Sequence, residues 1–389
     1  MTKTNNKRKV SVVVSARPSY SRIKTTLTAI NDHPDLELQL VVAASALLDR
    51  YGNAVNYIEK DGFEIASRVY MVLEGENLTS MAKTTGLGLL ELSTAFDNLQ
   101  PDIVVTVADR FETIATAIAA SYMNIPVAHV QGGEVTGNID ERVRHSVTKL
   151  SDFHFVSTQG AYDRVVKMGE EHSTVFLTGC PSIDIADTVL KNPVLNFDPF
   201  EKYGGVGKIT ELSDGYIVVM QHPVTLEYDQ SRHHVEETLE ATRELGLPAL
   251  WFWPNVDAGS DGTSKGIRAF REMYPDVKIH FFKGMEPVDF LRLLVNSKCL
   301  VGNSSVGIRE CSYLGVPVVN IGSRQRGREK SKNVINSGYT RLEIINAIRT
   351  QLEHGVYSND SLYGDGRAGS KIANLLATVP LKIDKVISY

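Results

Sequence analysis

Short apolar, β-branched runs alternate with amphipathic segments along the chain. In the first half, the predicted strands are 9–16, 36–45, 102–109, 126–133 and 153–158, and the predicted helices are 19–33, 112–124 and 140–151. Strands that are apolar along their whole length are typical of parallel sheets covered on both faces. The first half is therefore predicted to be a doubly wound α/β domain.

The pattern loses its regularity at 186–212, where proline, glycine and charged residues gather. This composition predicts a linker or an irregular start to a second domain. A second series then follows, with strands at 216–224, 248–255, 277–284, 298–305 and 316–322 and helices at 231–246, 286–297 and 369–379. We expect two Rossmann-like α/β domains, 1–185 and 186–370, that face each other across a cleft.

Composition excludes several classes of protein. The chain has 389 residues, with 41 Lys and Arg against 46 Asp and Glu, so its net charge is −5. A general nucleic-acid binder would usually be basic. The three cysteines form no CxxC pair, and we expect neither a metal site nor a disulfide framework. No apolar run approaches a membrane span. We therefore expect a cytosolic protein that binds no nucleic acid and no membrane.

Ligands of doubly wound folds lie beyond the carboxyl ends of the strands, so the residues there are the candidates. Arg17 and Lys24 follow the first strand, where a helix N-terminus can receive an anion. The alternative is an ordinary loop with surface cations. The loop has no GxGxxG, which disfavours a dinucleotide site.

Carboxylates follow two later strands. Asp109 comes directly after the apolar run 102–109, where it can act as a base, cap a helix, or do both. The segment 129–145 holds Glu134, Asp140 and Arg144 after two adjacent glycines. Asp140 and Arg144 stand four residues apart, so on a helix they share one face and can form an ion pair. The alternative to a catalytic cluster is therefore a loop followed by a helix with ion pairs on its surface.

The second half places candidates for phosphate and ribose at similar positions. His222 follows a strand and can donate to a phosphate or move a proton. Ser304 and Ser305 can cap a helix that starts near Gly307 and leave its N–H groups for a phosphate. Glu310, about a turn into that helix, can accept hydrogen bonds from a ribose diol. Asn255 is a further candidate for binding the nucleotide. Three arginines, which either bind an anion or face water, are Arg324, Arg326 and Arg328.

Six motifs together resemble the UDP-N-acetylglucosamine 2-epimerase family, from about residue 9 to 375. They are ARPSYSRIK, ADRFET, HVQGGEVTGNIDERVRH, QHP, GNSSVGIREC and GREKSKNVI. The chain looks closest to the hydrolysing branch, which makes N-acetylmannosamine-type sugars. The resemblance implies the two-domain fold of GT-B glycosyltransferases, no cofactor, a homodimer, and a C-terminal helix, 371–389, that packs back toward the first domain.

The resemblance also implies roles for the candidates. Asp109, Glu134 and Asp140 would be the acid and base carboxylates, with Arg144 and His222 also in the catalytic set. Arg17, Lys24 and Arg144 would contact phosphate or support the carboxylates. Ser304, Ser305 and Gly307 would hold the phosphate near His222, and Glu310 would bind the ribose.

Two departures from the family bear on the branch. Many hydrolysing relatives carry a second histidine where Gln131 stands, and the non-hydrolysing branch carries glutamate there. The segment ASALLDRYGN does not match the place where non-hydrolysing relatives bind an allosteric nucleotide sugar. We therefore expect no such regulation and hydrolytic release of the product.

The expected activity is conversion of UDP-N-acetylglucosamine to UDP and free N-acetylmannosamine. It would proceed by anti elimination to a 2-acetamidoglycal, which water then hydrates. Alternatives are the same chemistry on UDP- or GDP-2,4-diacetamido-2,4,6-trideoxyglucose, a non-hydrolysing epimerase, and a GT-B glycosyltransferase. A nucleotide-sugar binding protein without activity is a rival from another class.

Overall fold

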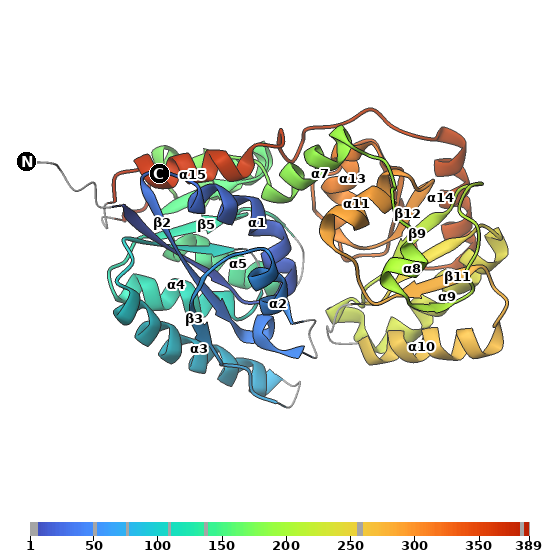
Figure 1. Ribbon diagram of the computed structural model, residues 1–389, viewed down its shortest axis with the longest axis horizontal. Coiled ribbons are helices and arrows are strands. Elements are labelled where there is room, and N and C mark those ends of the chain that lie inside the picture. The colour runs from blue at the N-terminus through green and yellow to red at the C-terminus, as the bar shows by residue number, and fades with distance from the viewer. Residues whose placement is uncertain are drawn as a thin grey trace, which may run out of the picture. The chain divides into compact units, whose positions relative to one another are not determined.

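The computed structural model of the chain describes residues 7–49, 53–74, 78–107, 110–135, 139–254, 260–381 and 385–388. Its internal contacts divide it into two compact units. The first unit holds Met1–Val135, Ile139–Asp184 and Gly364–Tyr389, and the second holds Ile185–Tyr363. Each unit is a sheet with helices on both faces, which confirms the predicted α/β fold class with two Rossmann-like domains (Figure 1).

The first unit contains a seven-stranded parallel sheet in the order β3-β2-β1-β4-β5-β6-β7. Its strands are β1 (Arg8–Val14), β2 (Leu36–Ala43), β3 (Ile65–Val69), β4 (Ile103–Val107), β5 (Val127–Val130), β6 (Phe153–Val156) and β7 (Val175–Leu177). The chain runs outward from β1 to β3 and then returns to β4. The strand order therefore reverses between β1 and β4, which is where doubly wound folds bind ligands.

Alternate residues of these strands pack into two cores, one on each face of the sheet. Val12 of β1 packs with Ile23 of α1 on one face, and Val13 packs with Phe96 of α3 on the other. This two-sided burial explains the continuous apolar runs. The helices of this unit are α1 (Arg17–Asn31), α2 (Ala54–Lys60), α3 (Leu78–Leu99), α4 (Thr113–Tyr122), α5 (Ile139–Leu150), α6 (Gln159–Lys167) and α15 (Ala368–Thr378), with short 3-10 turns at η1 (Ala44–Leu47) and η3 (His172–Thr174).

The last helix, α15, lies beside α1 although the two are far apart in the sequence (Figure 1). Ile372 of α15 joins the same core as Leu27 of α1. A Cβ at Gly369 would lie 2.7 Å from the carbonyl carbon of Thr25, so only glycine permits this close approach. The helix ends at Thr378, and so it is shorter than the predicted helix 371–389.

The second unit contains another seven-stranded sheet, in the order β14-β13-β12-β9-β10-β11-β8. Its strands are β8 (Val206–Gly207), β9 (Ile217–Met220), β10 (Ala249–Phe252), β11 (Ile279–Phe282), β12 (Cys299–Gly302), β13 (Val318–Ile321) and β14 (Val334–Ser337). All pairs are parallel except that of β8 with β11, which is antiparallel. The strand order reverses between β9 and β12.

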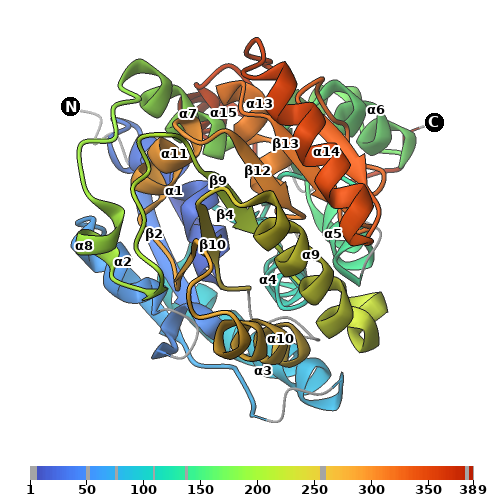
Figure 2. The ribbon, with the colours of Figure 1, turned by 90° about the vertical axis from the view of Figure 1, so that its right-hand side faces the viewer.

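This sheet is also buried on both faces. Val219 of β9 packs with Trp251 on one face, and Val218 packs with Phe252 on the other. Helix α9 contacts both α10 and α14 (Figure 2). The helices of this unit are α8 (Pro199–Tyr203), α9 (Ser231–Leu245), α10 (Ser260–Met273), α11 (Pro287–Val295), α12 (Ser305–Ile308), α13 (Glu310–Leu314) and α14 (Arg341–His354), with a 3-10 turn at η4 (Thr225–Gln230).

The chain passes from the first unit to the second inside a helix rather than in a linker. Helix α7 (Pro181–Lys191) runs across the boundary between Asp184 and Ile185. The irregular stretch that was predicted at 186–212 therefore begins as a helix. Its later part contains α8 and the antiparallel strand β8, which covers the edge of the second sheet.

Within the described ranges, every helix is too short or too polar to cross a membrane. The three cysteines, Cys180, Cys299 and Cys311, are buried and form no disulfide. Burial raises the pKa of Cys299 to about 12, so this side chain remains a thiol.

Candidate active site

The carboxyl ends of β1, β4, β5 and β6 lie at one edge of the first sheet, because these strands are parallel neighbours. Arg17 follows β1 and Glu134 follows β5, so the topology brings both predicted residues to this edge. Asp109, which follows β4, lies outside the described residues, and its role stays a prediction. The edge also contains the reversal of strand order, as expected of a ligand site.

Glu134 is buried at the end of a tight turn that follows β5. Gln131 and Gly133 take left-handed backbone conformations, with φ of 67° and 75°. A Cβ at Gly133 would lie 2.4 Å from the carbonyl oxygen of Ala161, so this position requires glycine. Arg144, only 1% exposed, donates from Nη1 to the Glu134 carbonyl oxygen at 2.9 Å. The buried guanidinium therefore fixes the loop that carries the Glu134 carboxylate.

Helix α5 positions two of the predicted residues. Arg144 points from its second turn to the Glu134 loop, whereas Asp140 lies in the first turn and its side chain is outside the described part of the structure. A contact between two charged-type side chains of i,i+4 spacing on this helix joins His145 Nε2 and Glu141 Oε1 at 3.3 Å. The buried Arg144 thus anchors the loop that carries Glu134.

The two predicted site cations on α1, Arg17 and Lys24, are engaged within the first unit. The Arg17 guanidinium lies 4.6 Å from the ring centroid of Tyr57, and Lys24 Nζ lies 2.7 Å from Asp61 Oδ1. Helix α1 begins at Arg17 with proline in its first turn, and Ala16 provides no side-chain cap. Its first N–H groups and the Arg17 charge can therefore receive an anion. A phosphate at Lys24 would compete with Asp61.

In the second unit, the loops after β9 and β12 are joined through Asn303. The His222 N–H donates to Asn303 Oδ1 at 2.7 Å, and Asn303 Nδ2 donates to the His222 carbonyl oxygen at 2.8 Å. Burial, aided by the Arg324 charge, lowers the pKa of His222 to about 3. The His222 imidazole is therefore neutral near pH 7, and it offers one N–H donor rather than a positive charge.

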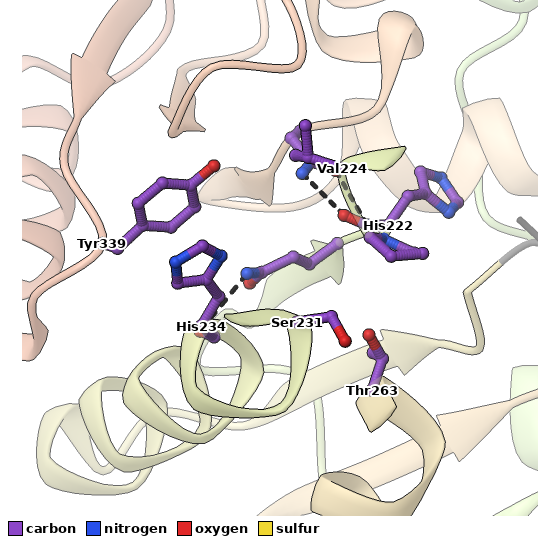
Figure 3. Close-up of a pocket in the computed structure, with 9 residues that line it drawn as sticks. His222, Val224, Ser231, His234, Thr263 and Tyr339 are labelled. Carbon is purple, nitrogen blue, oxygen red and sulfur yellow. Dashed lines mark hydrogen bonds between the residues drawn. The ribbon is translucent and has the colours of Figure 1, made fainter. Parts of the chain in front are cut away.

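A small cavity of about 10 Å³ lies beside the loop after β9. Figure 3 shows the Ser231 and Thr263 oxygens pointing toward each other, and the His222 ring pointing away from His234 and Tyr339. The rings of His234 and Tyr339 stack with centroids 3.5 Å apart. This volume is enough for one water molecule and too small for a sugar. The cavity is lined by Gln221, His222, Pro223, Val224, Ser231, His234, Thr263, Asn303 and Tyr339.

The turn after β12 holds the predicted serines. Ser304 is the N-cap of α12, and its Oγ accepts from the Val306 N–H at 3.5 Å. The helix begins at Ser305, two residues before the predicted start near Gly307, and it is only four residues long. So short a helix contributes little dipole, so any anion binding must rely on individual donors. A Cβ at Gly307 would lie 2.9 Å from Val318 Cγ1, so this glycine is needed for packing on β13.

Glu310 begins the next short helix, α13, and is buried. Between the two helices stands Arg309, which is 2% exposed and donates from Nη2 to Ser305 Oγ at 2.8 Å. Asn255 lies outside the described residues, so its role stays a prediction. In the loop after β13, Arg326 is exposed but Arg328 is buried. The alternative that all three arginines of this loop face water is therefore wrong.

Sequence reasoning missed Asn303 and Arg309. Both lie in the stretch NSSVGIRE, and neither is among the predicted site residues. An asparagine directly after a buried strand at a strand-order reversal was the available signal for the first. No local pattern marked Arg309 as buried, because arginines usually face water.

Comparison with known proteins gives a consistent result. The model of the UDP-N-acetylglucosamine 2-epimerase family matches residues 28–377. A Legionella pneumophila protein named UDP-N,N'-diacetylbacillosamine 2-epimerase (hydrolyzing) is 34% identical over 374 residues, 96% of this chain and 97% of the relative. A Campylobacter jejuni protein named GDP/UDP-N,N'-diacetylbacillosamine 2-epimerase (hydrolyzing) is 31% identical over 343 residues, 87% of this chain and 86% of the relative.

The fold also matches solved structures. A crystal structure of UDP-GlcNAc 2-epimerase from Neisseria meningitidis bound to UDP-GlcNAc superposes with a TM-score of 0.76 at 17% identity, covering 95% of this chain and 99% of that one. This match confirms the predicted GT-B-like fold. The family match over residues 28–377, with a relative that is 34% identical over 96% of the chain, shows that this chain belongs to the UDP-N-acetylglucosamine 2-epimerase family.

Proposed function

We propose that the chain is a hydrolysing 2-epimerase, which converts a UDP-activated 2-acetamido sugar and water to UDP and the free 2-epimer. The observation that carries the hydrolytic part is the similarity along most of the chain to two relatives whose names include hydrolyzing, at 34% and 31% identity. The buried Glu134 and the serine turn provide groups of the kind that this chemistry needs.

The reaction must break a C2–H bond that no neighbouring carbonyl acidifies. Departure of the diphosphate from C1 gives that carbon oxocarbenium character, which acidifies the C2 hydrogen. A carboxylate takes the C2 proton, the C1–O bond breaks toward the UDP oxygen, and a C1–C2 double bond forms. Water then adds its oxygen to C1, and a proton is delivered to C2 on the opposite face. One carboxylic acid and one carboxylate divide this work.

In this proposal the first unit provides the acid and base groups. Glu134, Asp109 and Asp140 are the carboxylates, and Arg144 holds the loop of Glu134 in place. Arg17, at the uncapped start of α1, is available to an oxygen of the diphosphate. Lys24 joins it only if the substrate displaces Asp61.

The second unit provides the groups that bind UDP. Ser304 and Ser305 donate hydroxyl hydrogens to the diphosphate, and the neutral His222 adds one N–H donor. Glu310 accepts from the ribose hydroxyls, and Asn255 is assigned to the nucleotide. Fixed donors stabilise the charge that develops on the leaving diphosphate, which is how this unit would accelerate the reaction.

Two sugars are considered. The names of the two relatives favour diacetylbacillosamine, which is 2,4-diacetamido-2,4,6-trideoxyglucose, and we take its UDP derivative as the first candidate. UDP-N-acetylglucosamine, which the sequence suggested first, is the second candidate because the family description names it. A homodimer and a cytoplasmic location stay predictions.

The test is incubation of the purified chain with UDP-N-acetylglucosamine and with the UDP and GDP derivatives of the diacetamido sugar, followed by NMR of the products. The proposal predicts free 2-epimer and nucleoside diphosphate from at least one UDP substrate. A product still linked to the nucleotide would instead indicate a non-hydrolysing epimerase. Binding of all three substrates without turnover would indicate a binding protein, and transfer to an added sugar acceptor a glycosyltransferase.

A further inference from the structure

Arg309 is one of the largest fully buried side chains among the described residues. A guanidinium keeps its charge in proteins, so burying it is costly unless acceptors surround it. Its position is unusual, because it forms both the end of α12 and the start of α13. Its contacts therefore reach both parts of the proposed UDP site.

The first contact is with Ser305. Arg309 Nη2 donates to Ser305 Oγ at 2.8 Å. A serine hydroxyl can donate one hydrogen and accept others. The guanidinium N–H points at a lone pair of Ser305 Oγ, so the Ser305 hydroxyl hydrogen must point in another direction. The positive charge of Arg309 also makes the Ser305 hydroxyl a stronger hydrogen-bond donor. Arg309 thus turns Ser305 into a group that binds anions.

The second contact is with Glu310, whose Oε2 lies 3.8 Å from Arg309 Nε. The Glu310 carboxylate is buried, and the guanidinium lies beside it as its ion-pair partner. An ionised, oriented carboxylate is what the proposed recognition of the ribose hydroxyls requires. One cation therefore supports both a phosphate donor and a ribose acceptor.

We infer that Arg309 is a positioning residue for UDP, which orients the Ser305 hydroxyl toward the diphosphate and holds Glu310 for the ribose. This inference rests on the proposed function, because it assumes that UDP binds at the serine turn. Arginine is required rather than lysine, because only the planar fork presents separate N–H groups to both neighbours.

The test is a double-mutant cycle of Ser305→Ala and Arg309→Lys, read as the UDP dissociation constant by calorimetry. Arg309→Lys is expected to weaken UDP binding about tenfold when Ser305 is present and by a clearly smaller factor, the part that acts through Glu310, in the Ser305→Ala background. Arg309→Gln is carried through the same cycle, so that the result does not depend on the folding of one variant. Arg349→Lys, an exposed arginine on α14, is the matched control and should leave binding unchanged.

A second readout concerns Glu310. The wild type should prefer UDP over 2′-deoxyUDP, and Arg309→Lys should reduce that preference. Equal losses of UDP affinity in both backgrounds, with the preference unchanged, would overturn the role of Arg309 and leave the proposed function standing. Absence of UDP binding by the wild type would overturn the proposed function and this inference together.

Discussion

The side chain of Asn303 is hydrogen-bonded to both backbone groups of His222, at 2.7 Å and 2.8 Å. This pair joins the loops after β9 and β12, the two strands between which the second sheet reverses its order. The Asn303 carbonyl oxygen also accepts from Gln325 Nε2 at 2.8 Å, so the loop after β13 is attached to the same residue. A single buried asparagine therefore fixes three loops at the carboxyl edge of the sheet.

Replacing Asn303 by alanine should destabilise the second unit and weaken UDP binding. The buried N–H and C=O of His222 would lose their partners, which costs about 2 kcal/mol of unfolding free energy. Urea unfolding and calorimetry with UDP measure the two effects. Asn346→Ala, an exposed asparagine on α14, is the control. Unchanged stability and UDP affinity in Asn303→Ala would show that these bonds do not hold the site together.

His222 should make stability depend on pH in the acid range. Burial lowers its folded-state pKa to about 3, whereas an unfolded histidine titrates near 6.5. Between these values the unfolded chain binds a proton that the folded chain does not. The free energy of unfolding should therefore fall as the pH drops from about 6.5 toward 3, by up to about 1.4 kcal/mol per pH unit.

Urea unfolding at pH 7, 6 and 5 measures this effect. The free energy of unfolding should change less steeply with pH in His222→Gln than in the wild type. His233 is an exposed neighbour on α9, so His233→Gln should keep the wild-type pH dependence. The same pH dependence in all three proteins would contradict a neutral, buried His222.

Glu170 should be a strong stabilising charge of the first unit. Burial alone would raise its pKa, but hydrogen bonds from His154, Lys149 and Lys385 outweigh that effect and lower the pKa to about 2. Because the folded pKa lies below the unfolded value, this stabilisation is present above pH 4.5 and is lost as the pH falls toward 2.

Glu170→Gln removes the counter-charge of two lysines and should cost about 2–3 kcal/mol of unfolding free energy at pH 7. The neighbouring Glu171→Gln changes an exposed side chain and should have little effect. Urea unfolding of the two variants side by side gives the comparison. Equal stability of both variants would mean that the Glu170 cluster contributes no net stability.

Gly133→Ala should disturb the loop of Glu134 more than backbone strain alone explains. Gly133 and Gly62 both have left-handed φ, 75° and 86°, so alanine at either position costs about 1–2 kcal/mol. Only at 133 does a Cβ also meet the carbonyl oxygen of Ala161, at 2.4 Å, whereas nothing lies within 4 Å at 62.

Gly133→Ala should therefore lose more stability than Gly62→Ala and also lose kcat, because the Glu134 carboxylate shifts. Stability is measured by urea unfolding, and turnover is measured as UDP release. If Gly133→Ala keeps wild-type turnover, Glu134 need not be held in this position for catalysis.

The sequence predicted ten of the fourteen strands among the described residues and missed β3, β7, β8 and β14. The runs that became β1, β4, β9 and β12 are rich in apolar residues at consecutive positions because both faces of each sheet are buried, and that signal is local. The order of the strands in the two sheets was not predicted, because it depends on which strands pair in space. The short antiparallel strand β8, in a glycine-rich segment, carries no such pattern because it has only two residues.

The site residues that directly follow a buried strand could be predicted from the sequence. The contacts between side chains from distant segments could not. Glu134 and Ser304 were found because they follow buried strands. The pairing of Lys24 with Asp61, and the burial of Arg309, depend on which segments meet in space. The helix crossing at Asp184 was missed because proline, glycine and charge downstream suggested an irregular segment.

In the proposed reaction, a proton is removed from C2 of the sugar and a different one is returned to the other face. The most direct test is turnover of the accepted UDP-sugar in D₂O, followed by NMR and mass spectrometry of the released sugar. The account predicts a free sugar with inverted C2 that carries one deuterium at C2, together with UDP. A released sugar that keeps its C2 configuration and its C2 hydrogen would contradict it.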